Sequence, residues 1–336
     1  MGNQKSFSFS YKLNESTNNE VEFDAHVNVW NISDKKENPF IDFGLLIRNY
    51  QNVNSICFIS PFKVENENID DLSHLLKENE IQLIFNNSKY KYKQIPDSIY
   101  AGYDDANKET VLILPIKDEA GKNLTHISCQ STREENLKLI IYLYKCRDIP
   151  KSIKSIYIRF RIKNIDTKKL LSTLSAKNNY LESAFIKRQI LDFKLNNVRT
   201  IDKFDLSALN SDGYILTQFK AIHLFVMVPS DYEISIWGDF SECRQLEKDE
   251  WNDYLNNYVL DSTNDISAYH WKQVSKEEQV DEFAQLIKME HKATNWKLIF
   301  IYCLIVIILG SLGSALYEGI KSLVKLIISI VQTSIC

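Results

Sequence analysis

Apolar and polar residues alternate along much of the first 270 residues of this chain. Between Val21 and Val29 every second position is apolar, and polar residues such as His26 and Asn28 fill the positions between them. A two-residue period is typical of a half-buried strand. Similar alternation, or short runs rich in β-branched residues, predicts further strands over 42–49, 55–60, 81–86, 110–116, 137–145, 155–163, 184–194 and 221–228.

Turn-forming clusters such as NISDKKENP, DDANKE, DEAGKN and RDIPKS separate these segments. This spacing predicts a mainly β fold, an antiparallel β-sandwich with a few short helices. We expect a β-rich domain over 1–167. A second β-rich part over 168–272 is either a separate domain or continuous with the first.

Helical spacing is less frequent. Capping residues followed by spaced apolar positions predict short helices over 69–78, 168–175 and 247–259. Ser275 and Glu278 form a capping box, after which Val280, Phe283 and Leu286 recur at helical spacing. This predicts a juxtamembrane helix over 275–297 that continues into the C-terminal apolar segment.

The chain ends in two apolar runs. Residues 298–317 carry no charge, and about 20 such residues cross a hydrocarbon core of roughly 30 Å. Trp296 and Tyr317 flank this run, as aromatic residues do at membrane interfaces. We therefore predict a transmembrane helix over 298–317. Within it the small residues Gly310, Gly313 and Ser314 favour close approach of another helix, or equally permit a bend.

The second run, 318–336, predicts an amphipathic helix. Its polar residues recur at positions that share one side of a helix. They are Glu318, Lys321, Ser322, Lys325, Ser329 and Gln332. A charged stripe that faces lipid costs several kcal/mol per charge near the midplane. Two arrangements avoid that cost: an interfacial helix with its stripe in water, or a second crossing whose stripe faces an axis shared by several copies.

Charge indicates orientation and partners. The formal net charge is −4, and because residues 291–336 hold four lysines and one glutamate, the preceding residues carry −7. A mildly acidic body argues against nucleic acid as a partner. Lys288, Lys292 and Lys297 precede the apolar run, and the chain starts without an apolar leader segment. The positive-inside rule then predicts a membrane protein whose large N-terminal region lies on the cytoplasmic side.

The strand over 155–163 has an unusual basic side. Isoleucine and phenylalanine occupy one side, and Tyr157, Arg159, Arg161 and Lys163 occupy the other. Lys89, Lys91 and Lys93, interleaved with tyrosines, extend such a surface in our prediction. Spaced arginines beside a tyrosine suit a small anionic ligand or an acidic protein partner. The alternative is a solvated strand face that pairs with acids on neighbouring strands.

Catalytic motifs are absent from the sequence. It contains no GxxxxGK[ST], GxSxG, HExxH or GxGxxG pattern. We expect no catalytic residue, metal site or cofactor. Asp192 and Lys194 have the D-x-K spacing of some metal-dependent nucleases, with Glu182 as a guess for the second acid; a solvent-facing salt bridge on a strand is the favoured explanation of the pair.

Taken together, these features predict a membrane-anchored cytosolic sensor or effector that is not an enzyme. Its partners would be the lipid bilayer, further copies of the chain as a homo-oligomer, and a protein partner or small anionic ligand. The layout is similar to that of membrane-acting effectors in bacterial antiviral defence, in which ligand binding drives oligomerisation and bilayer damage, although no motif is shared. The alternatives are a tail-anchored scaffold that recruits a protein partner, and a membrane-tethered metal-dependent nuclease.

Overall fold

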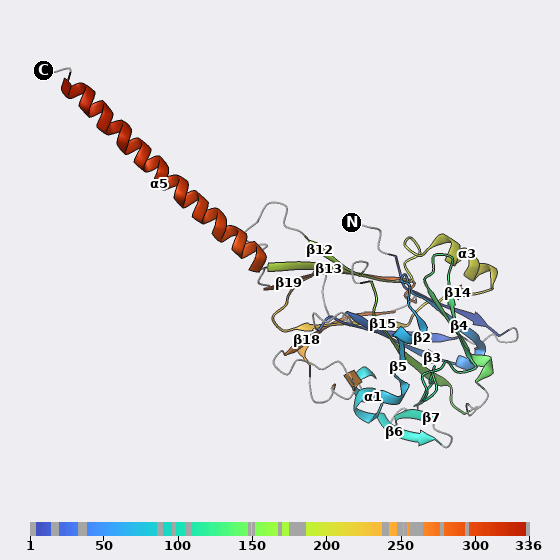
Figure 1. Cartoon of the computed structure of the whole chain (residues 1–336). Coiled ribbons are helices and arrows are strands. Elements are labelled where there is room, and N and C mark those ends of the chain that lie inside the picture. Colours follow the sequence, from blue (N-terminus) through green and yellow to red (C-terminus); the bar gives the residue numbers. More distant parts are fainter. Residues whose placement is uncertain are drawn as a thin grey trace. The chain divides into compact units, whose positions relative to one another are not determined.

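The structure is a computed structural model (Figure 1). It describes residues 5–14, 20–32, 39–85, 90–95, 99–104, 109–146, 149, 152–166, 170–174, 186–236, 242–246, 251, 254–255, 265–275, 279–292 and 296–333. The chain divides into two compact units: Met1–Thr173 with Gln189–Met289, and Leu174–Arg188 with Glu290–Cys336. The first unit contains strands from both of the predicted β-rich ranges.

The described strands lie in three sheets. A five-stranded sheet has the order β14-β1-β4-β10-β9, and a four-stranded sheet has the order β12-β13-β19-β16. A ten-stranded sheet has the order β17-β18-β15-β2-β3-β11-β8-β7-β6, with β5 beside β11. The strands are β1 (Ser8–Leu13), β2 (Glu22–Trp30), β3 (Phe40–Arg48), β4 (Val53–Ile59), β5 (Ile69–Asp71), β6 (Tyr90–Ile95), β7 (Ile99–Asp104), β8 (Glu109–Ile113), β9 (Ile127–Ser131), β10 (Leu137–Tyr142), β11 (Ser155–Ile162), β12 (Leu171–Leu174), β13 (Ile186–Leu195), β14 (Ile215–Leu216), β15 (Ala221–Pro229), β16 (Glu233–Ile236), β17 (Glu242–Gln245), β18 (Ile266–Val274) and β19 (Phe283–Lys292).

The helices are fewer than the strands. They are α1 (Glu78–Phe85), α3 (Lys203–Ser211) and α5 (Trp296–Thr333), with 3-10 turns at Tyr50–Asn52, Asn66–Asn68, Ser73–Leu75 and Leu143–Lys145. Trp251, Tyr254 and Leu255 are also helical and buried, so the predicted apolar side of the helix over 247–259 is confirmed at these residues. The prediction of a mainly β protein with a long apolar C-terminal helix is confirmed.

The ten-stranded sheet is mixed. β2 pairs antiparallel with β3 and parallel with β15, while β11 pairs antiparallel with β3 and parallel with β8. β2 belongs to the first predicted β-rich range and β15 to the second. Their pairing along seven residue positions places both ranges in one sheet.

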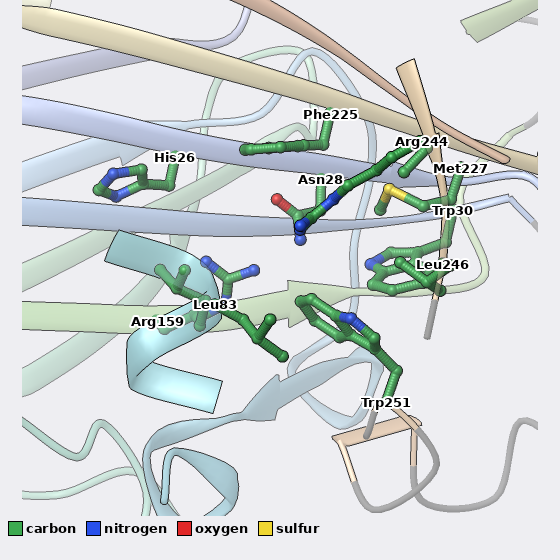
Figure 2. Close-up of a pocket in the computed structure, with 12 residues that line it drawn as sticks. His26, Asn28, Trp30, Leu83, Arg159, Phe225, Met227, Arg244, Leu246 and Trp251 are labelled. Carbon is green, nitrogen blue, oxygen red and sulfur yellow. The ribbon is translucent and has the colours of Figure 1, made fainter. Parts of the chain in front are cut away.

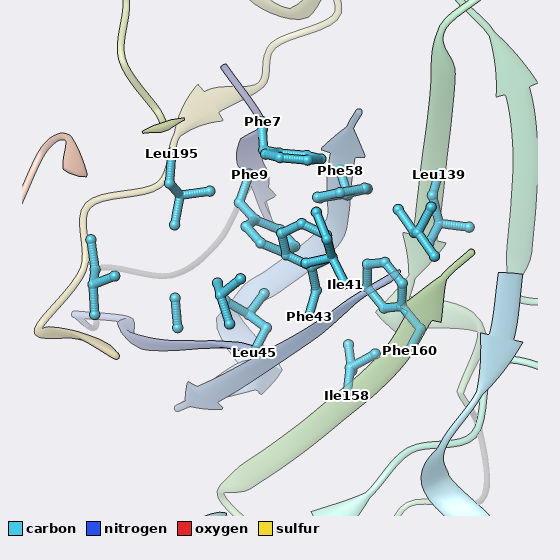
Figure 3. Close-up of a cluster of buried hydrophobic side chains, with 14 of the residues drawn as sticks. Phe7, Phe9, Ile41, Phe43, Leu45, Phe58, Leu139, Ile158, Phe160 and Leu195 are labelled. Carbon is cyan, nitrogen blue, oxygen red and sulfur yellow. The ribbon is translucent and has the colours of Figure 1, made fainter. Parts of the chain in front are cut away.

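One face of this sheet packs against the other sheets in a large apolar core. The aromatic rings of Phe7, Phe9, Phe43, Phe58 and Phe160 meet there (Figure 3), with the Phe43 and Phe58 centroids 4.8 Å apart. These positions alternate with outward-facing residues along their strands, as the two-residue period requires.

The opposite face of the sheet is covered as well. A second apolar cluster packs there, in which residues of α1 and the helical Trp251, Tyr254 and Leu255 lie over β2, β3 and β11. A strand in such a sheet is buried on both sides even where its sequence alternates. Polar side chains on this covered face must therefore find partners within the protein.

Three local predictions are wrong. Residues 81–86 were expected as a strand, but Glu78–Phe85 is helix α1, in which Ile81 and Ile84 share the buried side. A short apolar run fits either structure, and length alone does not separate them. Over the helix expected at 69–78 the structure has the short strand β5 and the 3-10 turn Ser73–Leu75, and β12 lies within the helix expected over 168–175.

The juxtamembrane helix predicted over 275–297 is also wrong. Phe283–Lys292 forms β19, in which Phe283, Ile287 and Met289 are buried while Leu286 is 44% exposed. The sequence therefore contained two overlapping periods. The two-residue period prevailed because β19 pairs within the sheet of β13 and β16.

Candidate functional site

The candidate site lies on the covered face of the ten-stranded sheet. Successive residues of a strand point to opposite faces, so His26, Asn28 and Trp30 of β2 share this face. The register then aligns rows across the sheet: Asn28 pairs with Asp42, which pairs with Arg161, and His26 pairs with Gly44, which pairs with Arg159. The fold thus gathers two arginines, an aspartate and a histidine in adjacent rows.

The basic side that was predicted for the strand over 155–163 is buried rather than exposed as a surface. Tyr157, Arg159 and Arg161 do share one side of β11, but they are 0%, 0% and 2% exposed. The layer formed by α1 and by the helical residues near Tyr254 covers them. Lys163 is only half-buried and pairs with Asp70 at 3.0 Å.

Of the three lysines that were expected to extend this surface, Lys91 is the one whose side chain the structure describes, and it does not join it. Lys91 is exposed on β6, which β7 and β8 separate from β11. Lys93 belongs to the same strand, but its side chain lies outside the described residues, as does the whole of Lys89.

Asp42 is the centre of a buried polar network. Its carboxylate accepts from Arg161 Nε at 2.6 Å and from Arg161 Nη2 at 3.1 Å, the two-point geometry that suits guanidinium and carboxylate groups. It also accepts from Trp30 Nε1 and from the Tyr254 hydroxyl, each at 2.8 Å. Burial raises the pKa of Tyr254, which keeps this hydroxyl protonated as a donor.

Arg159 has a different set of partners, all of them neutral. Its Nε donates to the Tyr254 hydroxyl at 2.6 Å and its Nη1 donates to the Tyr157 hydroxyl at 2.8 Å. With the Asn28 amide turned so that its nitrogen donates to the Val27 carbonyl, its oxygen accepts from Arg159 Nη2 at 2.9 Å. Burial acts to lower the pKa of Arg159, but neighbouring Tyr157, Tyr254 and Asp42 outweigh it, so the guanidinium stays charged.

Gly44 makes this arrangement sterically feasible. It lies between His26 and Arg159 in the row. A Cβ at this position would collide with the Tyr157 hydroxyl and would lie 3.1 Å from Arg159 Nη1. Any larger residue would therefore displace the hydroxyl from the guanidinium.

A pocket opens beside Arg159 (Figure 2). Its walls come from β2, β11, β15, β17, β18, α1 and the helical Trp251. The lining residues are His26, Asn28, Trp30, Leu83, Ile84, Arg159, Phe225, Met227, Arg244, Leu246, Trp251 and Ala268. The cavity is narrow, about 20 Å³, which holds a water molecule or two.

Histidines extend the site along the sheet. His223 Nδ1 lies 3.1 Å from His270 Nε2, and the rings of His26 and His223 are 5.1 Å apart. Burial, with the nearby charges of His270 and Lys272, lowers the pKa of His223 to about 3. Burial, with Lys272 and Arg244, lowers the pKa of His270 to about 4 although Glu242 opposes the shift. Both rings are neutral near pH 7.

Metal chemistry finds little support in the described part of the chain. No group of three His, Cys, Asp or Glu side chains there could hold a metal ion. Asp192 and Lys194 form a salt bridge of 2.8 Å with each other, and Glu182 lies outside the described residues. The basis for the nuclease alternative is thus accounted for by an ion pair on a strand.

The second candidate site is α5. The two segments predicted separately, 298–317 and 318–336, belong to one helix that is continuous from Trp296 to Thr333. The most apolar window of its span Ile299–Ile330 has a mean hydropathy of 2.5, and none of that window is buried. Glu318 and Lys321 pair at 3.4 Å, and open space surrounds Gly310 and Gly313. The side chain of Gln332 lies outside the described residues.

Several residues of the pocket escaped the sequence prediction. The sequence pattern assigned His26 and Asn28 to the polar side of a half-buried strand, and it indicated neither Arg244 nor the neighbouring Asp42 as a site residue. Trp251 was expected only on the apolar side of a helix. One signal was present in the sequence. Trp30 shares a side of the strand with His26 and Asn28, and a solvated side would leave this large apolar ring exposed.

Comparisons with known proteins add no functional assignment. No protein-family model and no curated protein matches the chain. Among solved structures it is similar to an M1 zinc metallopeptidase of Deinococcus radiodurans, at 8% identity and a TM-score of 0.27, over 84% of this chain and 42% of the peptidase chain. It is also similar to the Fcho1 mu homology domain of Danio rerio, at 5% identity and a TM-score of 0.15, over 87% and 82% of the two chains. Likenesses this weak carry no argument about fold or function.

The network predicts unequal effects for the two arginines. Arg161→Met leaves the Asp42 carboxylate buried without a cation, so we expect the free energy of unfolding to fall by about 3–5 kcal/mol. Arg159→Met removes a charge that has no carboxylate partner, so we expect a smaller loss. Urea denaturation of the detergent-solubilised chain measures both, with exposed Arg133→Met as control. Equal losses at positions 159 and 161 would contradict this account.

The histidines predict a loss of stability in acid. In the unfolded chain a histidine has a pKa near 6.5, whereas His223 and His270 titrate at about 3 and about 4 in the fold. The unfolded state therefore binds more protons below pH ~6.5, and stability falls as the pH drops towards 4 and then 3. His223→Gln with His270→Gln should flatten this slope in thermal unfolding between about pH 7 and pH 4, while exposed His74→Gln should not.

Proposed function

We propose that this protein is a membrane-anchored sensor or effector, without enzymatic activity, that self-associates through α5 and perturbs the bilayer. The observation that carries the proposal is the single helix α5, whose apolar side chains are exposed along its described length. Exposed apolar surface on this scale is costly in water and favourable in lipid. Membrane association is therefore the first element of the proposal.

The length of α5 exceeds what one crossing needs. At about 1.5 Å per residue, the 32 residues of Ile299–Ile330 extend about 48 Å, against a hydrocarbon core of roughly 30 Å. Tilt alone would have to reach about 50°, beyond the usual range of 0–40°. If Leu298–Tyr317 fills the core, the segment after it continues past the lipid tails. Its leucines and isoleucines then need another cover, and further copies of α5 provide one.

Helix continuity aligns the two features that favour self-association. At about 100° per residue, Gly310 and Ser314 fall on the same side of α5 as Glu318, Lys321 and Lys325. Small residues let two helices approach closely, and polar residues beyond them then face the same partner or a shared wet axis. Gly313 lies beside this face. We assign it as the contact between copies.

Lysines near the start of α5 support a cytoplasmic β domain. Lys288 and Lys292 lie on β19 and Lys297 lies in the first turn of α5, all within the distance over which positive charge sets topology. A reporter fused to the N-terminus should therefore resist protease that is added outside intact cells. Digestion of that reporter would reverse the proposed orientation.

Dye release from vesicles tests the effector role. Full-length protein is reconstituted into vesicles of phosphatidylcholine and phosphatidylglycerol, with and without added acetate and phosphate. Lys325→Leu with Gln332→Leu removes polar groups from the proposed contact face, so release should fall to background. Membrane binding should persist, because Leu298–Tyr317 is intact.

A matched control changes the opposite side of the same segment. Leu323→Ile with Ile327→Leu keeps that side apolar and should release dye like the unaltered protein. Unaltered protein that is monomeric in detergent and leaves vesicles tight under all these conditions would exclude the effector role. That outcome would favour a tail-anchored scaffold that recruits a protein partner.

A further inference from the structure

On the covered face of the ten-stranded sheet, two buried arginines, Arg159 and Arg161, lie near the buried carboxylate of Asp42. Asp42 is fully buried and paired with Arg161, so this carboxylate is already neutralised. Arg159 is buried beside it, and among the described residues no carboxylate forms an ion pair with it. A buried cation without a counterion is costly, and the cost falls when an anion binds.

The pocket beside Arg159 offers donors in excess of acceptors. Trp251 Nε1 is a donor only, and it is buried without a hydrogen-bond partner. His26 Nδ1 is also buried without a partner, and the neutral ring can place its proton there. Asn28 Oδ1 is occupied by Arg159, and among the lining residues that the structure describes there is no aspartate or glutamate. These groups together match a ligand that only accepts hydrogen bonds.

The surroundings limit the size of that ligand. The indoles of Trp30 and Trp251 lie 5.6 Å apart at one end of the pocket, and Phe225 lies over Asn28 (Figure 2). The space of about 20 Å³ is too small for a large organic molecule. Leu83 and Arg244, which are half-buried, also belong to the wall.

We infer that this pocket binds the carboxylate group of a small anionic ligand between Arg159 and Arg244, with His26 and Trp251 as further donors. A planar carboxylate fits the narrow space better than a tetrahedral phosphate, and guanidinium groups bind it with two parallel hydrogen bonds. The inference rests on the proposed function in one respect, which is the role of this pocket as the sensing site of a membrane-anchored sensor. Binding itself is independent of any effect on membranes.

Tryptophan fluorescence reports on the pocket directly, because Trp30 and Trp251 line it. The full-length protein in detergent is titrated with acetate, with acetamide as the neutral counterpart of similar shape and with inorganic phosphate. We expect a saturable change and a raised unfolding temperature with acetate, and neither with acetamide. Phosphate should bind more weakly than acetate.

Two variants separate binding from folding. Arg244 lies on β17 and is only half-buried. Arg244→Gln should weaken acetate binding about tenfold to hundredfold through loss of a charge-assisted hydrogen bond, and thermal unfolding verifies that this variant is folded. Arg133→Gln, an exposed arginine outside the pocket, should bind acetate as the unaltered protein does. Arg159→Met should abolish binding, and its unfolding transition checks that the variant is folded.

The outcomes are distinct. An equal response to acetamide, no saturable response to acetate, or unchanged binding in folded Arg244→Gln and Arg159→Met would overturn the inference. Tighter binding of phosphate than of acetate would overturn its carboxylate preference. Acetate binding by a protein that never releases dye supports the pocket and refutes the effector role. Dye release by a protein that binds no acetate supports the effector role and refutes the binding pocket.

Discussion

The buried carboxylate of Asp42 sets the conditions for one whole face of the protein. A charge with no exposed surface must be neutralised and fully hydrogen-bonded, and Arg161, Trp30 and Tyr254 together meet that requirement. Arg161 comes from β11, Trp30 from β2 and Tyr254 from the layer above the sheet. The network therefore ties the covering layer to the strands beneath it and specifies the register between them.

This network also makes the two faces of the sheet physically different. The face towards the other sheets is apolar at its centre and is held by aromatic packing around Phe43 and Phe58. The covered face combines apolar packing with charge, so each polar group there needs a specific partner. On this face the buried Nδ1 of His26 and Nε1 of Trp251 have no hydrogen-bond partner, and Arg159 has only neutral ones. Incomplete satisfaction in a buried site is the physical basis on which a binding function is assigned to it.

The C-terminal helix has the surface of a segment that is suited to lipid rather than to water. In lipid a continuous helix satisfies its own backbone groups, so α5 needs no neighbours for its hydrogen bonds. Its side chains decide where it can lie: apolar residues from Ile299 onward favour the hydrocarbon core, while Glu318, Lys321 and Lys325 do not. Because helix α5 is continuous between these parts, the depth at which its charged residues can lie also limits the depth of its apolar end. That coupling supports the assignment of one face of α5 to contacts between copies.

Local chemistry in the sequence was sufficient for part of this structure. The two-residue period predicted β2, β3, β11 and β15 closely, and the uncharged run from Leu298 predicted an apolar helix, because both signals depend on neighbouring residues alone. It also placed Arg159 and Arg161 on the same side of one strand. Only the tertiary structure decided that this side is covered, since burial depends on what packs over a strand from distant segments such as Trp251 and Tyr254. The same holds for the partners: Asp42 lies 119 residues from Arg161, and sheet register, invisible to any local pattern, brings them together.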